Sequence, residues 1–322
     1  MTVAQPAPAG HGEEHHDPLG SPPDEAVGAA LARPERAVGA ADKVSGRTRY
    51  AGDRKVAGAL AAAFLASPVA HGRIRSIDVS AARAVPGVRA VLTGADLEGV
   101  RFGRRLLDRP VLAWDRVRFV GDRLAAVAAE TAEAAEAAIA AIEVDIEELE
   151  PLFDLDAALR DGAPVLHPDA EGYAYIGGTR SAVAHPNVQG TLVRRRGAED
   201  IEAVFAGAAR VFEHEFRTPS QHAGYIEPHA TVVWIDEQDV VHVVTTNKTP
   251  LSLRNQMARS IGIPAERIEI DAGAIGGDFG GKGYCIDEFA CVFLARATGL
   301  GGIMFWELSG DTANGELIRA ID

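Results

Sequence analysis

The sequence is poor in cysteine, with only Cys285 and Cys291 among 322 residues. Two thiols are too few for a disulfide framework or for an iron–sulfur cluster that needs four thiolates. A reducing, cytoplasmic setting is therefore the simplest expectation. The chain also lacks an apolar run long enough to cross a membrane, and its start, MTVAQPAPAG, lacks the charged and hydrophobic regions of a secretion signal. We expect no membrane partner and no export signal.

Positive charge is also scarce, since 32 basic residues face 46 acidic ones and leave a net charge of −14. A nucleic-acid partner is disfavoured, because a phosphate backbone binds basic surfaces. Apolar content, by contrast, is ample: 47% of the residues are hydrophobic, which is enough for a sizeable core. The length of the chain predicts about two domains.

Residues 1–40 are rich in Pro, Gly, Ala and Glu and have few large apolar side chains. Such a segment cannot bury enough surface to offset its ordering entropy, so we interpret it as a disordered leader. His11, His15 and His16 lie close together there and could trap a metal ion. A solvated polar tail is the favoured interpretation of these histidines.

A compact α+β pattern follows over residues 41–160. Apolar runs and apolar–polar alternation predict strands at residues 73–79, 88–92, 124–128 and 143–149. Thr131 is placed to cap a helix with an apolar stripe, and Glu133 suits the positive end of that helix. The secondary structure of residues 59–66 stays open between helix and strand, and their alanine content by itself favours a helix.

Residues 161–187 shift to Gly, Pro, His and Asp without periodicity, which predicts a linker. A second domain is expected over residues 188–322. Its predicted strands are residues 211–217, 230–235, 240–245 and 267–270. One helix is expected over residues 198–205, and another is expected to be capped by Thr249, to open at Pro250 and to stop at Gly262.

A glycine-rich loop, GGDFGGKG at residues 276–283, lies between the last predicted strand and a predicted helix that stops at Gly299. Glycine has no Cβ, so backbone amides in such a loop can turn toward a bound anion and approach it closely. The positive end of the following helix dipole would add to this attraction. We therefore expect the loop to hold a phosphate-bearing ligand or an oxo-anion.

Two alternatives stay open from the loop residues alone. Gly276, Gly281 and Lys282 fit the first part of a nucleotide P-loop, G-x-x-x-x-G-K. Gly283, however, stands where that motif needs a Ser or Thr hydroxyl for magnesium. The loop could also be a tight strand-to-helix turn that holds no ligand.

The loop sequence GGDFGGK resembles the G-G-G-F-G-G-K segment of the molybdenum-binding subunit in the xanthine dehydrogenase and aldehyde oxidase family. In that family the segment lies against the molybdenum cofactor. Four further stretches are similar, in order and spacing, to the family's α/β-hammerhead domain: GRTRYAGD, SPVAHGRIRSIDVSAARAVPGVRAVLTGADL, VRFVGDRLAAVAAETAEAAEAA and VDIEELEPLFDLDAAL. Gln221 followed by Glu227 also matches the family, and the resemblance reaches from about residue 45 to about residue 306.

This resemblance implies an α+β chain with an α/β-hammerhead domain over residues 41–160, in which residues 59–66 form a strand. The first, incomplete molybdenum-cofactor-binding domain would follow over residues 188–322. It implies a hydroxylase that oxidises an aldehyde, N-heterocycle or similar small molecule with water as the oxygen source. The implied cofactor is molybdenum–molybdopterin, commonly the cytosine dinucleotide form, shared with a partner. The [2Fe-2S] clusters and FAD are expected on partner subunits of a hetero-oligomer.

The family's cofactor-contacting positions match Gln221, Gly276, Gly277, Phe279, Gly280 and Gly281. On this resemblance Gln221 donates its amide to an oxygen ligand of molybdenum, and Glu227 holds the loop. No residue of the chain is expected to ligate the metal directly. Gly283 is the substrate-pocket position of this resemblance. It replaces the glutamate that pairs with the substrate in purine hydroxylases, so a purine substrate is disfavoured.

The family's general base is a glutamate far downstream, beyond Asp322, so no catalytic residue is assigned in this chain. We therefore expect half of a split subunit, a truncated product or a fragment, completed by a C-terminal molybdenum-domain partner. Asp278 replaces a glycine of the motif, and its carboxylate would repel an anionic cofactor unless it points away. The alternative is a non-catalytic binding or interaction module of the same fold.

Overall fold

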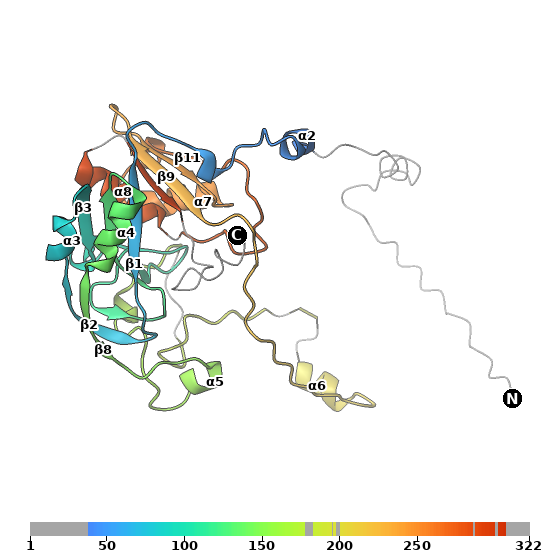
Figure 1. Cartoon of the computed structure of the whole chain (residues 1–322). Coiled ribbons are helices and arrows are strands. Elements are labelled where there is room, and N and C mark those ends of the chain that lie inside the picture. Colours follow the sequence, from blue (N-terminus) through green and yellow to red (C-terminus); the bar gives the residue numbers. More distant parts are fainter. Residues whose placement is uncertain are drawn as a thin grey trace, which may run out of the picture. The chain divides into compact units, whose positions relative to one another are not determined.

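The computed structural model describes residues 38–177, 183–194, 196–197, 200–285, 287–299 and 302–306 (Figure 1). The predicted leader up to residue 37, with its three histidines, lies outside the described residues, as do residues 307–322 of the predicted second domain. The chain divides into two units, Met1–Thr48 and Arg49–Asp322. In the first unit, the short helix α2 (Ala40–Val44) is followed by Arg47, which pairs with Asp42 at 2.9 Å.

The described part of the second unit is built on a mixed sheet of seven strands, in the order β11-β10-β9-β12-β1-β7-β3 (Figure 1). These strands are β1 (Leu60–Ala66), β3 (Val88–Thr93), β7 (Arg123–Ala129), β9 (Ala230–Ile235), β10 (Val241–Thr245), β11 (Ile268–Asp271) and β12 (Ile303–Trp306). Strands β1 and β12 pair in parallel, with Leu60 opposite Ile303. Strands from both predicted domains therefore share one sheet, and the boundary between the domains stays a prediction.

Strand β7 is buried on both faces, because its alternate side chains enter two different cores. Ala126 and Ala128 join the core that includes α7 and α8, whereas Ala125, Val127 and Ala129 join the core that includes α4. The four helices that pack on this sheet are α3 (Ser80–Ala84), α4 (Ala132–Ala140), α7 (Pro250–Ile261) and α8 (Glu288–Thr298). Small alanine side chains in β7 let helices approach the sheet closely on both sides.

Two smaller sheets belong to the same unit, one in the order β6-β2-β8 and one formed by β4 and β5. Their strands are β2 (Gly72–Asp78), β4 (Arg101–Phe102), β5 (Arg109–Pro110), β6 (Arg116–Val117) and β8 (Glu143–Glu148). The remaining helices are α5 (Leu155–Ala158), α6 (Ile201–Ala206) and the 3-10 turns η1 (Ala51–Asp53), η2 (Gly94–Leu97), η3 (Ala170–Gly172) and η4 (Ala265–Arg267). Of all the helices the structure describes, none has the length and apolarity that a membrane span requires.

Most elements expected from periodicity are confirmed, including their ends. Thr131 caps α4, since its Oγ1 accepts a hydrogen bond from the amide of Ala134 at 3.2 Å. Gly262 and Gly299 end α7 and α8 in the left-handed conformation, with φ of 68° and 59°, which glycine adopts without strain. The ambiguous segment 59–66 contains the strand β1.

Two local predictions are wrong. Residues 211–217 form no paired strand, because no strand in the described part of the chain lies beside them to complete the backbone hydrogen bonds. Phe212 and Phe216 are accordingly exposed. The side chain of Thr249 does not cap α7; instead Asn247 Oδ1 accepts hydrogen bonds from the Thr249 amide at 2.9 Å and from Thr249 Oγ1 at 3.0 Å.

Candidate functional site

The glycine-rich loop, residues 276–283, follows β11 but does not run straight into a helix. Helix α8 begins at Glu288, so residues 284–287 separate the loop from the helix start. The attraction of a helix dipole for anions falls off within the first turn. The expected contribution of this dipole to the loop stays a prediction.

The loop is held by residues 223–227, which we name the clamp segment. Oε2 of Glu227 accepts hydrogen bonds from the Gly276 amide at 2.5 Å and from Nζ of Lys282 at 2.6 Å. The Lys282 side chain is fully buried, and its ammonium lies 4.9 Å from the centre of the Tyr225 ring. Glu227 thus holds the loop, as expected. This buried pair argues against the P-loop alternative, because a P-loop lysine must reach phosphates.

Two glycines of the loop are needed for its contact with the clamp segment. A Cβ added to Gly276 would lie 2.6 Å from Cβ of Glu227, and one added to Gly281 would lie 2.4 Å from Cε1 of Tyr225. Both distances are too short for any side chain. These glycines therefore let the loop pack against the clamp segment, and a direct contact of either one with a cofactor stays a prediction.

The opposite side of the loop is open. Gly280 has φ of 97°, and a Cβ added there would meet no atom within 4 Å. Phe279 is 77% exposed, and its φ of 43° is rare for a residue with a side chain. Gly277 also has a positive φ, 103°. Residues in such conformations cluster at functional sites, and here the conformation leaves the aromatic ring of Phe279 exposed to solvent.

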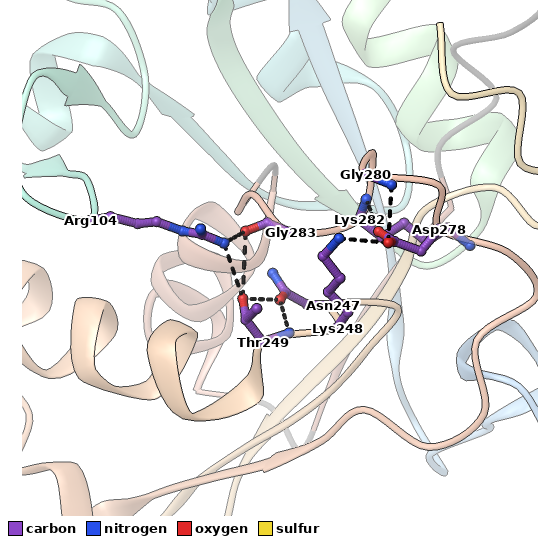
Figure 2. A network of polar contacts seen from close by, with 8 residues as sticks. All are labelled: Arg104, Asn247, Lys248, Thr249, Asp278, Gly280, Lys282 and Gly283. Carbon is purple, nitrogen blue, oxygen red and sulfur yellow. Dashed lines mark hydrogen bonds and ion pairs between the residues drawn. The ribbon is translucent and has the colours of Figure 1, made fainter. Parts of the chain in front are cut away.

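Asp278 points into its own loop (Figure 2). Its Oδ1 accepts a hydrogen bond from the Lys282 amide at 2.7 Å, and its Oδ2 accepts from the Gly280 amide at 3.1 Å and from Nζ of Lys248 at 2.6 Å. The hydrogen bond from Lys248 is the main cause that lowers the pKa of Asp278 from 3.8 to about 2, and the two amide bonds add to it against desolvation. The carboxylate is therefore compensated by Lys248, a partner that sequence reasoning missed.

Gln221 lies just before the clamp segment and is exposed. The segment carries the chain directly to the loop, because Ala223 Cβ lies 3.2 Å from the Cβ position of Gly281. Gln221 and the loop thus belong to the same region of the unit. The role of the Gln221 amide as a donor to a metal-bound oxygen stays a prediction.

Gly283 lines a cavity of about 530 Å³ beside the loop, together with Arg104, Arg105 and Tyr284. The Arg104 guanidinium donates hydrogen bonds to the Gly283 carbonyl and to Thr249 Oγ1, the latter at 3.4 Å (Figure 2). Sequence reasoning missed both arginines, since Arg104 and Gly283 are 179 positions apart and only the fold brings them together.

Two histidines beside the loop have hydrogen-bond partners in the structure. Nε2 of His229 lies 2.8 Å from the Tyr225 hydroxyl, and Nδ1 of His222 accepts a hydrogen bond from a clamp-segment amide at 3.0 Å. Cys285 and Cys291 are buried, and burial raises the pKa of both thiols. Within the described ranges, no three His, Cys, Asp or Glu side chains are grouped to hold a metal ion.

Two family models match the chain, one after the other. Residues 45–150 match the model described as aldehyde oxidase and xanthine dehydrogenase, a/b hammerhead domain, and residues 184–308 match the molybdopterin cofactor-binding domain. The chain belongs to the xanthine dehydrogenase and aldehyde oxidase family. The expected fold class, an α/β-hammerhead domain followed by molybdopterin-binding sequence in an α+β chain, is confirmed.

Relatives within the family are similar over most of this chain. The large molybdopterin subunit of nicotinate dehydrogenase from Eubacterium barkeri is 32% identical over 258 residues, which cover 80% of this chain and 56% of that subunit. A probable xanthine dehydrogenase subunit from Bacillus subtilis is 35% identical over 243 residues, covering 74% of this chain and 30% of the relative. The structure of reconstituted CO dehydrogenase from Oligotropha carboxidovorans aligns with a TM-score of 0.75 at 30% identity. The alignment covers 85% of this chain and 34% of the CO dehydrogenase chain. The chain thus spans from 30% to 56% of the length of these family members.

The open side of the loop fits the molybdopterin group of the family. Gly280 leaves room for close approach, Phe279 is exposed beside it, and Lys248 compensates the negative charge of Asp278. A flat organic group with anionic substituents can therefore approach this side without a steric clash or an uncompensated carboxylate. The Asp278 carboxylate is turned toward Lys248 and the amides of its own loop, which is the arrangement that an anionic ligand on the open side would require.

Proposed function

We propose that this chain forms one wall of the molybdenum-cofactor site of a molybdenum hydroxylase. The enzyme would oxidise an aldehyde, N-heterocycle or similar small molecule with water as the oxygen source. The observation that carries the proposal is the two-sided loop at residues 276–283. Glu227 and Lys282 fix its inner side, while Phe279 and Gly280 leave its outer side open. A fixed backbone with an open side suits a large ligand that must be held without rearrangement.

Individual residues would have separate roles in holding the cofactor. Gly280 would allow close backbone approach, and Phe279 would contact the flat part of the ligand. Gly276, Gly277 and Gly281 would give the loop its shape. Gln221 would donate its amide to an oxygen ligand of molybdenum, a role suited to an uncharged donor. When bound, the molybdenum cofactor supplies the oxygen-transfer and electron-accepting chemistry.

Other polypeptides would complete this enzyme. The proton-accepting base and the second wall of the site would come from a C-terminal molybdenum-domain partner, and the cofactor would be the cytosine dinucleotide form. Iron–sulfur and FAD subunits would carry electrons away from the site, in a cytoplasmic hetero-oligomer. The relatives support this arrangement, since two of them are themselves described as subunits of larger dehydrogenases.

The test is molybdenum and pterin analysis of the purified chain, alone and with its partner. We expect molybdenum and a fluorescent pterin in the complex, and a clear loss of both in Gly280→Val. Gly99→Val is the matched control, because Gly99 also has a positive φ, 82°, and open space at its Cβ position. Normal loading of the Gly280→Val complex would contradict the role of the loop. Absence of molybdenum and pterin from every preparation would overturn the proposal.

A non-catalytic module of the same fold is the second candidate, and one observation favours it. The Asp278 carboxylate already accepts hydrogen bonds from the amides of Gly280 and Lys282. Those two amides would otherwise be available to an external anion. The same analysis separates the candidates, because a non-catalytic module would carry neither molybdenum nor pterin in the complex.

A further inference from the structure

The cavity beside the loop is positively charged, although the chain as a whole carries a net charge of −14. Three arginines line it, Arg104, Arg105 and Arg109, and they come from one short segment of the predicted hammerhead domain. Asp108 is the only acidic residue among the lining residues. The arrangement therefore leaves an excess of positive charge along this cavity, which favours an anionic ligand.

Arg104 is fixed in place by the second predicted domain. Besides its hydrogen bonds to Gly283 and Thr249, its guanidinium lies 5.4 Å from the centre of the Tyr284 ring. A Cβ added to Gly283 would lie 3.2 Å from Nη2 of Arg104, which is a tight contact. Glycine at position 283 thus lets the guanidinium stay against the loop and beside the aromatic ring.

Neither of the other two guanidinium groups forms an ion pair in the part of the chain that the structure describes. Arg105 forms no hydrogen bond or ion pair through its side chain with any residue the structure describes. Arg109 lies 5.7 Å from the centre of the Phe102 ring and 5.9 Å from that of Phe119, and it too is without an ion pair among the described residues. Burial is the main cause that raises the pKa of Asp108, although the charges of Arg109, Arg101 and Arg118 act in the opposite direction.

The size and walls of the cavity narrow the class of ligand. About 530 Å³ suits one small molecule, and Phe102 and Tyr284 provide aromatic surface. A planar guanidinium pairs best with a planar carboxylate, through two parallel hydrogen bonds. We propose that this cavity binds a small aromatic carboxylate, so that the substrate of the enzyme is an aromatic acid. The cavity adjoins the cofactor loop, because Gly283 belongs to both. Its role as the substrate site therefore rests on the proposed function.

The test compares benzoate with benzamide, which has a similar shape but no charge. The purified full chain is titrated with each by isothermal titration calorimetry, with inorganic phosphate as a third ligand. We expect benzoate to bind at least about tenfold more tightly than benzamide or phosphate, because only benzoate offers both a carboxylate and a ring. Arg105→Gln should weaken benzoate binding about tenfold without unfolding the chain, since Arg105 is exposed and unpaired among the described residues.

Arg160→Gln is the matched control, because Arg160 is exposed and lies outside the cavity lining. Equal binding of benzoate and benzamide, or unchanged benzoate binding in Arg105→Gln, would overturn the inference. Phosphate binding as tight as that of benzoate would also overturn it, since the site would then be a general anion site. Because the titration needs no molybdenum, a chain that loads cofactor but does not bind benzoate refutes this inference and leaves the proposed function standing. Benzoate binding by a chain that never acquires cofactor supports the cavity site while the proposed function fails.

Discussion

The ammonium of Lys282 lies 2.6 Å from Oε2 of Glu227, and the Lys282 side chain is completely buried. The two residues are separated by 55 positions, and their ion pair joins the glycine-rich loop to the clamp segment. A buried charge is tolerated only while its partner is present, because desolvation without a partner is costly. The shape of the loop therefore depends on this pair.

Replacing Glu227 by Gln is expected to destabilise the chain by about 3 kcal/mol, because Lys282 would stay buried without a counter-charge. The free energy of unfolding is measured by urea denaturation. Glu237→Gln is the control, since Glu237 is exposed and unpaired within the described chain, and it should change stability by less than about 0.5 kcal/mol. Equal stability of Glu227→Gln and the wild type would show that the pair does not hold the loop.

Replacing Gly281 by Ala is expected to cost about 2 kcal/mol, because the new methyl group would overlap the Tyr225 ring. Tyr225 cannot move away freely, since its hydroxyl is 2.8 Å from His229. A double-mutant cycle with Tyr225→Ala should remove most of this cost. Gly280→Ala serves for comparison: its cost comes from its φ of 97° and should be the same with or without the Tyr225 ring. A Gly281→Ala cost that is independent of Tyr225 would contradict the packing described above.

Asp278 should make stability depend on pH in the acid range. Its pKa is lowered from 3.8 to about 2 in the folded chain, so its ionised form is favoured by folding. The resulting stabilisation is fully present above the unfolded pKa and is lost as the pH falls from about 4 toward 2.

Comparison with Asp278→Asn isolates this effect. The difference in urea midpoint between the wild type and Asp278→Asn should be largest near pH 5 and should shrink steadily on going to pH 3. Asp161→Asn, at an exposed position without an ion pair in the described residues, is the control for the effect of an Asp-to-Asn change itself. A constant difference from pH 5 to pH 3 would mean that Asp278 does not ionise more readily in the folded state.

Local sequence patterns were sufficient to predict most individual helices and strands, because the formation of each depends mainly on residues close together in the sequence. Alternation predicted β2 and β8, and Thr131 marked the start of α4. The same reasoning failed at residues 211–217, since a strand needs a neighbour as well as an alternating pattern. The resemblance of the loop to the family's motif correctly indicated the family, and the site at the loop stays a prediction.

Contacts between distant residues could not be predicted from pattern. Arg123 makes two hydrogen bonds of 2.9 Å to the Asp287 carboxylate, across 164 positions, and so ties β7 to the start of α8. Lys248 reaches Asp278 across 30 positions. Ion pairs of this kind depend on how the whole chain folds, so a list of charged residues does not reveal which of them meet.

The place of β12 in the central sheet has a consequence for how the chain is made. This strand, Ile303–Trp306, sits between β9 and β1, and it is the only link between the two groups of strands in that described sheet. Until the ribosome has released it, the nascent chain holds two separate partial sheets, each with one bare inner edge. Such edges recruit foreign strands. Pairing of β12 with both neighbours therefore closes these two inner edges, and a chain that lacks β12 should aggregate more readily.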